Sequence, residues 1–288
     1  MEYSGRCDTM GYGNISFDMD SWWALLDIKK KFISKKNDFV IKKSIPRIKN
    51  MLSKYNLRAT FFVLGPDVES FPGLYKELIK DGHEIASHTY SHFHDLKEKS
   101  LGTIREEIKK NHDIIRDRLK VEAIGFRAPN YSFNEKVLKV LEEEGYKYDS
   151  SLSPSFYPGV FPISWLRTPK KPYFPSRKNV LMKGSSSVLE IPLSSSCFFR
   201  LPLIGTSIRM LGQGFLRFSL LNAKNININF HARDAVPEIP YEKGLPPWIY
   251  INLENTIQRM DKALKLLSEK FDMITLGEYS ANVFQERK

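Results

Sequence analysis

Short runs of β-branched and aromatic residues alternate with longer amphipathic stretches along most of the chain. The short runs have the length and composition of buried strands, and they lie at residues 13–17, 58–63, 83–86, 123–126, 188–191, 226–230 and 273–276. The amphipathic stretches repeat apolar residues every three to four positions, as helices do, most clearly over 40–55, 101–119 and 252–270. Pro46 in the first of them requires either a first-turn position or a kink. This alternation predicts a parallel sheet covered by helices.

About seven strand–helix units in one chain favour a closed barrel over an open sheet. We therefore expect an α/β fold in which residues 1–288 form a single catalytic domain. Residues 151–187 are rich in Pro, Ser and aromatic residues, and we expect them to form an irregular excursion. In a (β/α) barrel the chemistry lies on the loops that follow the C-terminal ends of the strands.

The composition fits one large core with a basic surface. Hydrophobic residues make up 42% of the chain, and the formal net charge is +11. The lysines are scattered and no nucleic-acid-binding motif accompanies them, so we expect no nucleic-acid partner. An anionic membrane surface or a phosphate-bearing, lipid-linked sugar suits the charge. The segment 198–221 reads best as an ordinary amphipathic barrel helix, with an interfacial membrane helix as the alternative.

The two cysteines, Cys7 and Cys197, lie far apart and lack metal-ligand spacing, which argues against a disulfide framework and a thiolate metal site. Residues 1–14 lack an apolar core of signal-peptide length, and no apolar stretch is long enough to span a bilayer. We expect a cytoplasmic protein, with peripheral contact to the inner face of the membrane as an option. The sequence does not specify the oligomeric state.

Polar side chains that can carry out chemistry follow five of the strand ends. They are Asp18, Asp20, His88, His92, Arg127, Asp149 and His231. Each has an ordinary alternative explanation, such as an Asx turn, a helix cap or a surface arginine. Five strand ends that each deliver such a residue are harder to explain by chance, and we expect these residues to gather at the barrel mouth.

His88 and His92 lie four residues apart, the spacing by which a helical turn presents two imidazoles on one face. Together with an aspartate from a neighbouring strand end they would supply two nitrogen ligands and one oxygen ligand, with positions left open for water and substrate. We expect one divalent ion. Zinc is the first expectation, and cobalt, nickel or iron would suit the same ligands.

The order of these motifs resembles the polysaccharide deacetylase family, also called the NodB-homology or carbohydrate esterase family 4. The family order is an Asp-containing strand end, His-xxx-His, Arg-x-Pro, Asp and His. The sequences at 59–65 (ATFFVLG) and 82–88 (GHEIASH) are similar to the family's second and third strands. Residues 189–193 and 201–202 resemble the branch found with exopolysaccharide and cell-envelope sugar pathways. The resemblance implies a distorted (β/α) barrel that removes an N-acetyl or other N-acyl group from an amino sugar of a cell-envelope or lipid-linked glycan.

Carried over residue by residue, the resemblance assigns Asp20, His88 and His92 to the metal ion. It makes Asp18 the general base, with Arg127 keeping its carboxylate ionised. An adjacent guanidinium has this effect because it favours the charged form of the acid.

The same resemblance makes His231 the general acid, paired with Asp149, and gives the backbone amide near Asn130 a part in binding the oxyanion. Trp22 follows the first motif and could stack on a sugar ring, although packing under the barrel mouth explains it equally well.

Three departures from the family pattern bear on the substrate. Met19 separates two aspartates that are adjacent in many members, which leaves open which of them is the base and which the ligand. Asn130 and Ser150 stand where aromatic residues often form a groove wall. A shorter or lipid-linked glycan is therefore favoured over a long polymer. The alternatives are a cyclic imide or ureide hydrolysed at the same metal site, and a non-catalytic carbohydrate-binding scaffold.

Overall fold

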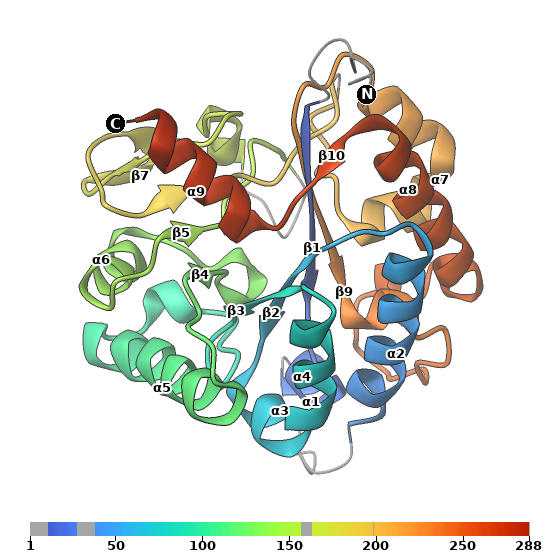
Figure 1. The fold of residues 1–288 in the computed structure, drawn as a ribbon, viewed down its shortest axis with the longest axis horizontal. Helices are drawn as coiled ribbons and strands as arrows, with labels where there is room; N and C mark the ends of the chain where they lie inside the picture. The colour runs from blue at the N-terminus through green and yellow to red at the C-terminus, as the bar shows by residue number, and fades with distance from the viewer. Residues whose placement is uncertain (1–10, 28–37, 157–162, 198, 288) are drawn as a thin grey trace, which may run out of the picture.

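The structure is a computed structural model that describes residues 11–27, 38–156, 163–197 and 199–287. Seven parallel strands form a curled sheet in the order β9-β1-β2-β3-β4-β5-β8 (Figure 1). They are β1 (Tyr12–Asp18), β2 (Thr60–Val63), β3 (Glu84–Ser87), β4 (Gly125–Phe126), β5 (Tyr148–Asp149), β8 (Leu189–Glu190) and β9 (Ile226–His231). The short strand β10 (Asp272–Met273) also pairs with β1, in parallel. The predicted distorted barrel of about seven parallel strands is confirmed.

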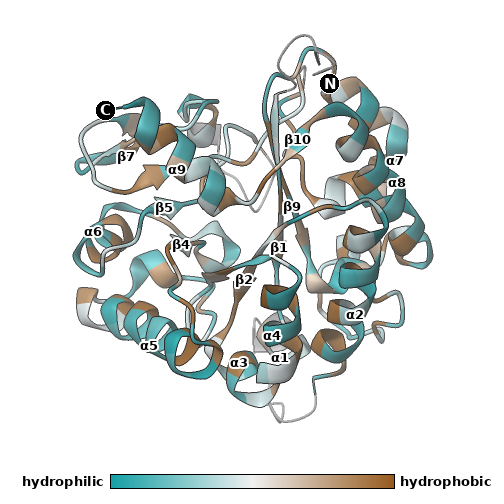
Figure 2. Ribbon diagram, in the orientation of Figure 1, coloured by the Kyte–Doolittle hydropathy of each residue, from teal (hydrophilic) through white to brown (hydrophobic). Residues whose placement is uncertain are grey.

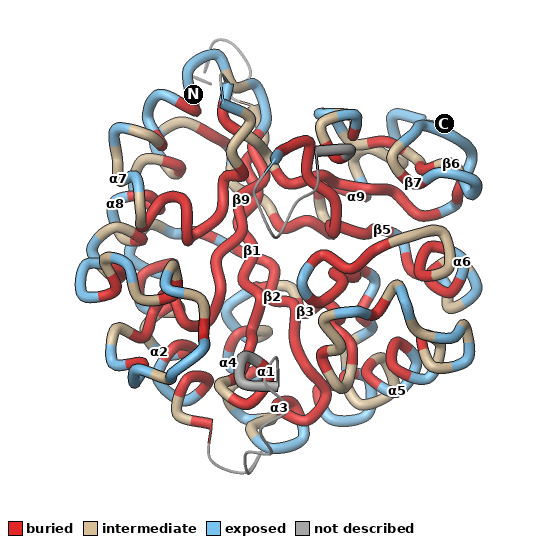
Figure 3. The backbone as a smooth tube through the Cα atoms, turned by 180° about the vertical axis from the view of Figure 1, so that it is seen from behind, coloured by how far each residue is buried: buried red, intermediate tan, exposed pale blue. Residues whose placement is uncertain are grey.

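The first strand, β1, alternates between an apolar face and a polar face. In β1, Ile15 and Phe17 point outward into the main hydrophobic core, while Ser16 and Asp18 make polar contacts inside the barrel. This alternation follows from the two-residue repeat of a strand, and all four side chains are buried because helices cover the outer face. Figure 3 shows the buried tube running through the strands and into the loops that follow them.

Helices cover the outside of the sheet and turn their hydrophilic residues to solvent (Figure 2). They are α1 (Trp22–Asp27), α2 (Phe39–Lys54), α3 (Gly65–Ser70), α4 (Pro72–Lys80), α5 (Leu101–Leu119), α6 (Glu135–Glu143), α7 (Gly205–Ser219), α8 (Thr256–Lys270) and α9 (Leu276–Glu286). The described residues contain no helix that is both long enough and apolar enough to cross a bilayer.

The clearest helix predictions are confirmed. The helix predicted over 101–119 has those bounds, and the Ser100 side chain caps its first turn by accepting a hydrogen bond from Thr103 N. The helix predicted over 40–55 is α2, and Asp38 caps it. Pro46 lies inside α2, beyond its first turn. The stretch predicted over 252–270 divides into a 3₁₀ turn at Leu253–Asn255 and α8.

One predicted strand needs correction, and one short strand was not predicted. The strand predicted over 273–276 ends at Met273, because Thr275 and Glu278 form a capping box that starts α9 at Leu276. The strand β5, only two residues long, was not among the predicted strands.

The predicted excursion at 151–187 contains a 3₁₀ helix (Ile163–Arg167) and an antiparallel hairpin of β6 (Pro175–Ser176) and β7 (Asn179–Lys183). Its residues 157–162 lie outside the described part.

The two outer strands of the sheet are β8 and β9. The amide side chain of Asn227, in β9, joins β9 to the segment that follows β8. Nδ2 of Asn227 donates to the carbonyl oxygens of Ile191 and Pro192, at 3.1 and 3.2 Å. The backbone of Ser194 also donates to Asn227 O, at 2.9 Å. The seam of the barrel is therefore joined by an asparagine and single backbone bonds in place of a regular ladder.

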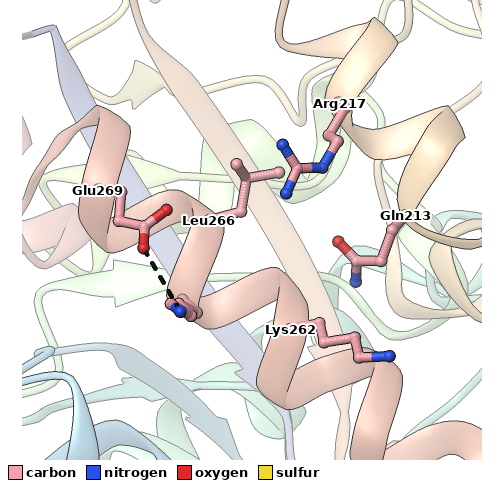
Figure 4. A pocket seen from close by; sticks show the side chains of 6 residues that line it. Gln213, Arg217, Lys262, Leu266 and Glu269 are labelled. Atoms are coloured by element: carbon pink, nitrogen blue, oxygen red, sulfur yellow. Dashed lines mark ion pairs between the residues drawn. The ribbon is translucent and has the colours of Figure 1, made fainter.

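The helices α7 and α8 pack side by side and leave a hollow of about 270 Å³ between them (Figure 4). Its lining residues are Gln213, Arg217, Lys262, Lys265, Leu266 and Glu269. None of these is among the seven residues predicted for the site, so this hollow is separate from the candidate site.

Candidate active site

Asp20, His88 and His92 come together beyond the C-terminal ends of β1 and β3. The Nε2 atoms of His88 and His92 lie 3.4 and 3.3 Å from Oδ1 of Asp20. All three side chains are buried. Burial raises the pKa of Asp20, but the charge of His92 and the close contacts with both imidazoles hold it well below its usual value.

The donor set fits a divalent metal ion. Nδ1 of His88 lies 2.7 Å from the carbonyl oxygen of Arg127, which can only accept, so a neutral His88 turns an unprotonated Nε2 toward Asp20. Among the described residues, Asp20 Oδ1 and both ring nitrogens of His92 have no hydrogen-bond partner. Buried acceptors that face each other need a positive charge between them, and one carboxylate with two imidazoles is a common set of zinc ligands.

The two histidines reach Asp20 from an irregular loop and not from the helical turn predicted for them. Thr89 and His92 both have left-handed backbone conformations, with φ of 68° and 58°. The hydroxyl of Thr89 accepts a hydrogen bond from the backbone N–H of His92 at 3.2 Å. These two backbone reversals bring the imidazoles within 5.2 Å of each other, centroid to centroid. The four-residue spacing is informative, although this loop, and not a helical turn, brings the two imidazoles together.

Asp18 lies beside this group and has both oxygens occupied. Its Oδ1 accepts a hydrogen bond from Arg127 Nη1 at 2.8 Å, and its Oδ2 accepts one from Asn229 Nδ2 at 2.9 Å. Burial raises the pKa of Asp18, but the charge of Arg127, with smaller effects from His88 and His231, lowers it overall. Asp18 is therefore a carboxylate at neutral pH, as predicted from the adjacent arginine.

His231 stands directly opposite Asp18 in the register of β1 and β9. Its Nε2 lies 3.7 Å from Oδ2 of Asp18, and its Nδ1 lies 3.8 Å from Oδ2 of Asp234. Asp234 also accepts a hydrogen bond from the backbone N–H of His231 at 3.0 Å. Burial raises the pKa of Asp234, but the contact with His231 and the charges of Arg209 and Arg233 lower it to about 2. His231 thus lies between the carboxylate of Asp234 and the metal-type cluster, by which we mean Asp20, His88 and His92.

A family model for polysaccharide deacetylases matches residues 28–148. A peptidoglycan deacetylase of Helicobacter pylori is 33% identical over 110 residues, which cover 38% of this chain and 36% of that protein. A peptidoglycan-N-acetylglucosamine deacetylase of Bacillus cereus is 36% identical over 102 residues, or 35% of this chain and 36% of that protein. Residues 28–148 therefore match the polysaccharide deacetylase family, and named peptidoglycan deacetylases are similar to this part of the chain.

The likeness in fold extends beyond the matched stretch. The crystal structure of a putative polysaccharide deacetylase from Mycobacterium smegmatis superposes with a TM-score of 0.68 and 20% identity, covering 99% of this chain and 93% of that one. At that identity the likeness shows the shared fold. In sequence, the matched part spans about a third of the length of each of the two curated relatives. The resemblance to the exopolysaccharide branch of the family stays a prediction.

The predicted pairing of Asp149 with His231 is wrong. Tyr148 and Ser150 point into the barrel, so the two-residue repeat of the strand turns Asp149 to the other face. There Asp149 accepts hydrogen bonds from the hydroxyl and backbone N–H of Ser151, and burial raises its pKa. Asp234 occupies the place beside His231 that Asp149 was expected to take.

The two residues predicted to contact substrate have different surroundings. Asn130 is exposed and follows Pro129 in a left-handed conformation, with φ of 48°. Its neighbour Tyr131 is buried, and the Tyr131 hydroxyl accepts a hydrogen bond from Asn229 at 3.1 Å. Trp22 is half-buried in an apolar cluster, which supports its packing interpretation. The oxyanion role near Asn130 stays a prediction.

Four residues at the site were missed in the sequence. Asn229 was detectable, because it lies two positions before His231 and so shares its face of β9. Asp234 was detectable as the carboxylate three residues after His231. The buried Arg233, whose Nη1 lies 3.2 Å from Oδ2 of Asp20, and the tyrosine at position 131 gave no comparable signal.

Proposed function

We propose that this chain hydrolyses the N-acetyl group of an amino sugar in a cell-envelope glycan, with a divalent metal ion held by Asp20, His88 and His92. The observation that carries the proposal is that Asp18 and His231 face each other beside the metal-type cluster, each with its own charged partner. Hydrolysis of an amide requires a base for the attacking water and an acid for the leaving nitrogen, and these two residues can divide that work.

The contacts of the two aspartates favour Asp20 as ligand and Asp18 as base. Asp20 turns an oxygen without a hydrogen bond toward two imidazoles. Both oxygens of Asp18 are instead held by Arg127 and Asn229. The fixed carboxylate of Asp18 can take a proton without moving, whereas the Asp20 oxygen is poised to bind a cation.

In the proposed reaction, a bound divalent ion would polarise the acyl carbonyl and make a water molecule more acidic. Asp18 removes the proton of that water as its oxygen attacks the carbonyl carbon. His231 then donates a proton to the sugar nitrogen as the C–N bond breaks, which releases acetate and the free amine. Asp234 holds the imidazole in place, with its Oδ2 3.8 Å from Nδ1 of His231.

The substrate class follows from the relatives together with the site. The curated relatives named above are peptidoglycan deacetylases, one of them described as acting on N-acetylglucosamine. We propose that this chain also acts on an N-acetylated amino sugar of the cell envelope. Within that class, we propose the lipid-linked form as its substrate. Zinc is the proposed ion, since two imidazoles and a carboxylate are ligands that it commonly takes.

The test is acetate release from a panel of N-acetylglucosamine oligomers, nucleotide-linked N-acetyl sugars and lipid-linked N-acetyl sugars. We expect release from at least one of them, its loss on adding a chelator and its recovery on adding Zn²⁺. The His88→Ala variant serves as the inactive control. A zinc-loaded protein that releases no acetate from any member would refute the proposal, and hydrolysis of a cyclic imide alone would favour the alternative substrate.

A further inference from the structure

The connection between β9 and α8 carries a group of aromatic residues at the same end of the barrel as the candidate site. The connection leaves from His231, the last residue of β9, and its first part lies beside α2 (Figure 1). Trp248 and Tyr250 pack with Leu245 and Ile249 in one apolar cluster. The cluster contains two aromatic residues of the connection, but a third, Tyr241, lies outside it.

Tyr241 is 78% exposed, the largest exposed fraction among the large hydrophobic residues of the described part. Its ring rests on that of Tyr250, with centroids 5.2 Å apart and planes inclined by 42°. The hydroxyl of Tyr250 accepts a hydrogen bond from the backbone N–H of Glu242 at 2.8 Å. Tyr250 therefore supports the turn that presents Tyr241, and the ring of Tyr241 has a fixed backing and an open face.

The cluster connects with the site by two routes. Trp22 packs into it and lies two residues after Asp20, so the two Cα atoms are within ~8 Å of each other. The second route runs through Arg209, whose guanidinium donates to the carbonyl oxygens of Ile249 and Ile251, at 2.8 and 2.7 Å.

Arg209 also lies 3.7 Å from Asp234, the partner of His231. It is buried and comes from α7, so one side chain joins the aromatic connection to the His231–Asp234 pair. Movement of the connection relative to the site is thereby restrained. An aromatic surface that is held this firmly can bind a ligand with little loss of its own entropy.

We propose that Tyr241, backed by Tyr250, is a stacking subsite for a pyranose ring of the glycan, away from the sugar that loses its acetyl group. A pyranose has a face of C–H groups rimmed by hydroxyls, and tyrosine offers an apolar ring with a polar tip. The identity of this ligand rests on the proposed function. The subsite supplies an aromatic wall from the β9–α8 connection, whereas Asn130 and Ser150 supply none at the positions where it was expected.

The test measures the binding of N-acetylglucosamine and of its tetramer, chitotetraose, to the full chain by calorimetry in the presence of a chelator. We expect the tetramer to bind wild type more tightly than the monomer does. Tyr241→Ala should weaken tetramer binding about three- to ten-fold, a range that follows from the energy of a single aromatic contact, and should bring the two affinities closer together. Tyr241→Phe should keep the affinity, because it retains the ring.

The matched control is Phe199→Ala, because Phe199 is 76% exposed but lies away from the candidate site. It is two residues from Cys197, whose Sγ is 3.6 Å from the carbonyl oxygen of Ser219 at the end of α7. That end of α7 leads into the start of β9, whereas Tyr241 follows the end of β9. We expect this variant to bind the tetramer as wild type does. Equal tetramer affinity in wild type and Tyr241→Ala overturns the subsite, and so does the absence of any binding to wild type. Because no turnover is required, an inert protein that binds the tetramer through Tyr241 would refute the deacetylase activity and leave the subsite supported.

Discussion

Nη1 of Arg127 lies 2.8 Å from Oδ1 of Asp18, and both side chains are almost completely removed from solvent. The guanidinium is held from its other side by Ser150, whose carbonyl oxygen accepts from Nε at 2.7 Å and whose hydroxyl accepts from Nη2 at 2.9 Å. Arg127 therefore reaches Asp18 in one orientation. The charge that keeps Asp18 ionised and the hydrogen bond that fixes its position come from the same residue.

Replacing Arg127 by lysine should lower kcat while the metal stays bound. Lysine keeps the charge but cannot reproduce a planar fork that contacts Asp18 and Ser150 together. We expect a loss of about 100-fold in kcat, at the lower end of what general-base catalysis contributes. Steady-state kinetics and the metal content of the same samples would check this. Activity close to that of wild type would show that catalysis does not require a guanidinium that contacts Asp18 and Ser150 together.

The proposed roles of Asp18 and His88 can be separated by metal content. Asp18→Asn should reduce turnover about 10²- to 10⁴-fold with the ion still bound, because Asn cannot accept the proton. His88→Ala should lose the ion and the activity together. Inductively coupled plasma mass spectrometry on both proteins gives the comparison, and equal metal retention in the two variants would contradict the assignment.

The partner of His231 can be identified by two substitutions that change a carboxylate to an amide. Asp234→Asn should lower kcat at least about ten-fold, because His231 loses the carboxylate that orients its imidazole. Asp149→Asn should leave kcat near the wild-type value, since burial raises the pKa of Asp149 and its contacts are with Ser151. Thermal melts would establish that both variants fold. The opposite ranking of the two activities would restore the original pairing of Asp149 with His231.

His83 should make the fold sensitive to mild acid. It is buried, its Nδ1 accepts a hydrogen bond from Ala59 N at 3.3 Å, and burial lowers its pKa to about 4. The unfolded chain binds a proton near pH 6.5 and the folded chain near pH 4, so the free energy of unfolding falls as the pH drops through this window. The pKa difference corresponds to at most ~3 kcal/mol.

The variant His83→Gln has no such titration. Urea unfolding at pH 7.5 and pH 5 should show a smaller loss of stability for the variant than for wild type. The difference between the two proteins isolates His83 from the carboxyl groups that titrate in the same range, such as Asp67, whose pKa burial raises to about 8. Parallel losses in both proteins would contradict the prediction.

The sequence predicted the elements whose pattern is long enough to repeat. The helix over 101–119 has five turns and a capping serine, and β1 and β9 have seven and six residues in which apolar and polar side chains alternate. The face on which Asp149 lies could not be predicted, because a two-residue strand shows no alternation from which to read a face. The loop from His88 to His92 depends on two left-handed residues that are not glycine, and such backbone conformations leave no mark in the pattern. Cytoplasmic location and membrane contact stay predictions.

The pairing of β1 with β9 has a consequence for the order in which the protein is made. Asp18 belongs to the first strand of the chain, but its neighbour His231 ends the ninth, and Asn229 comes with it. A ribosome-bound chain that ends before β9 has the aspartates and both imidazoles but no acid and no amide to hold the base. Contacts this distant along the chain also form late in folding. Under the proposed function, hydrolytic activity should thus appear only after residues 226–231 have emerged and paired with β1.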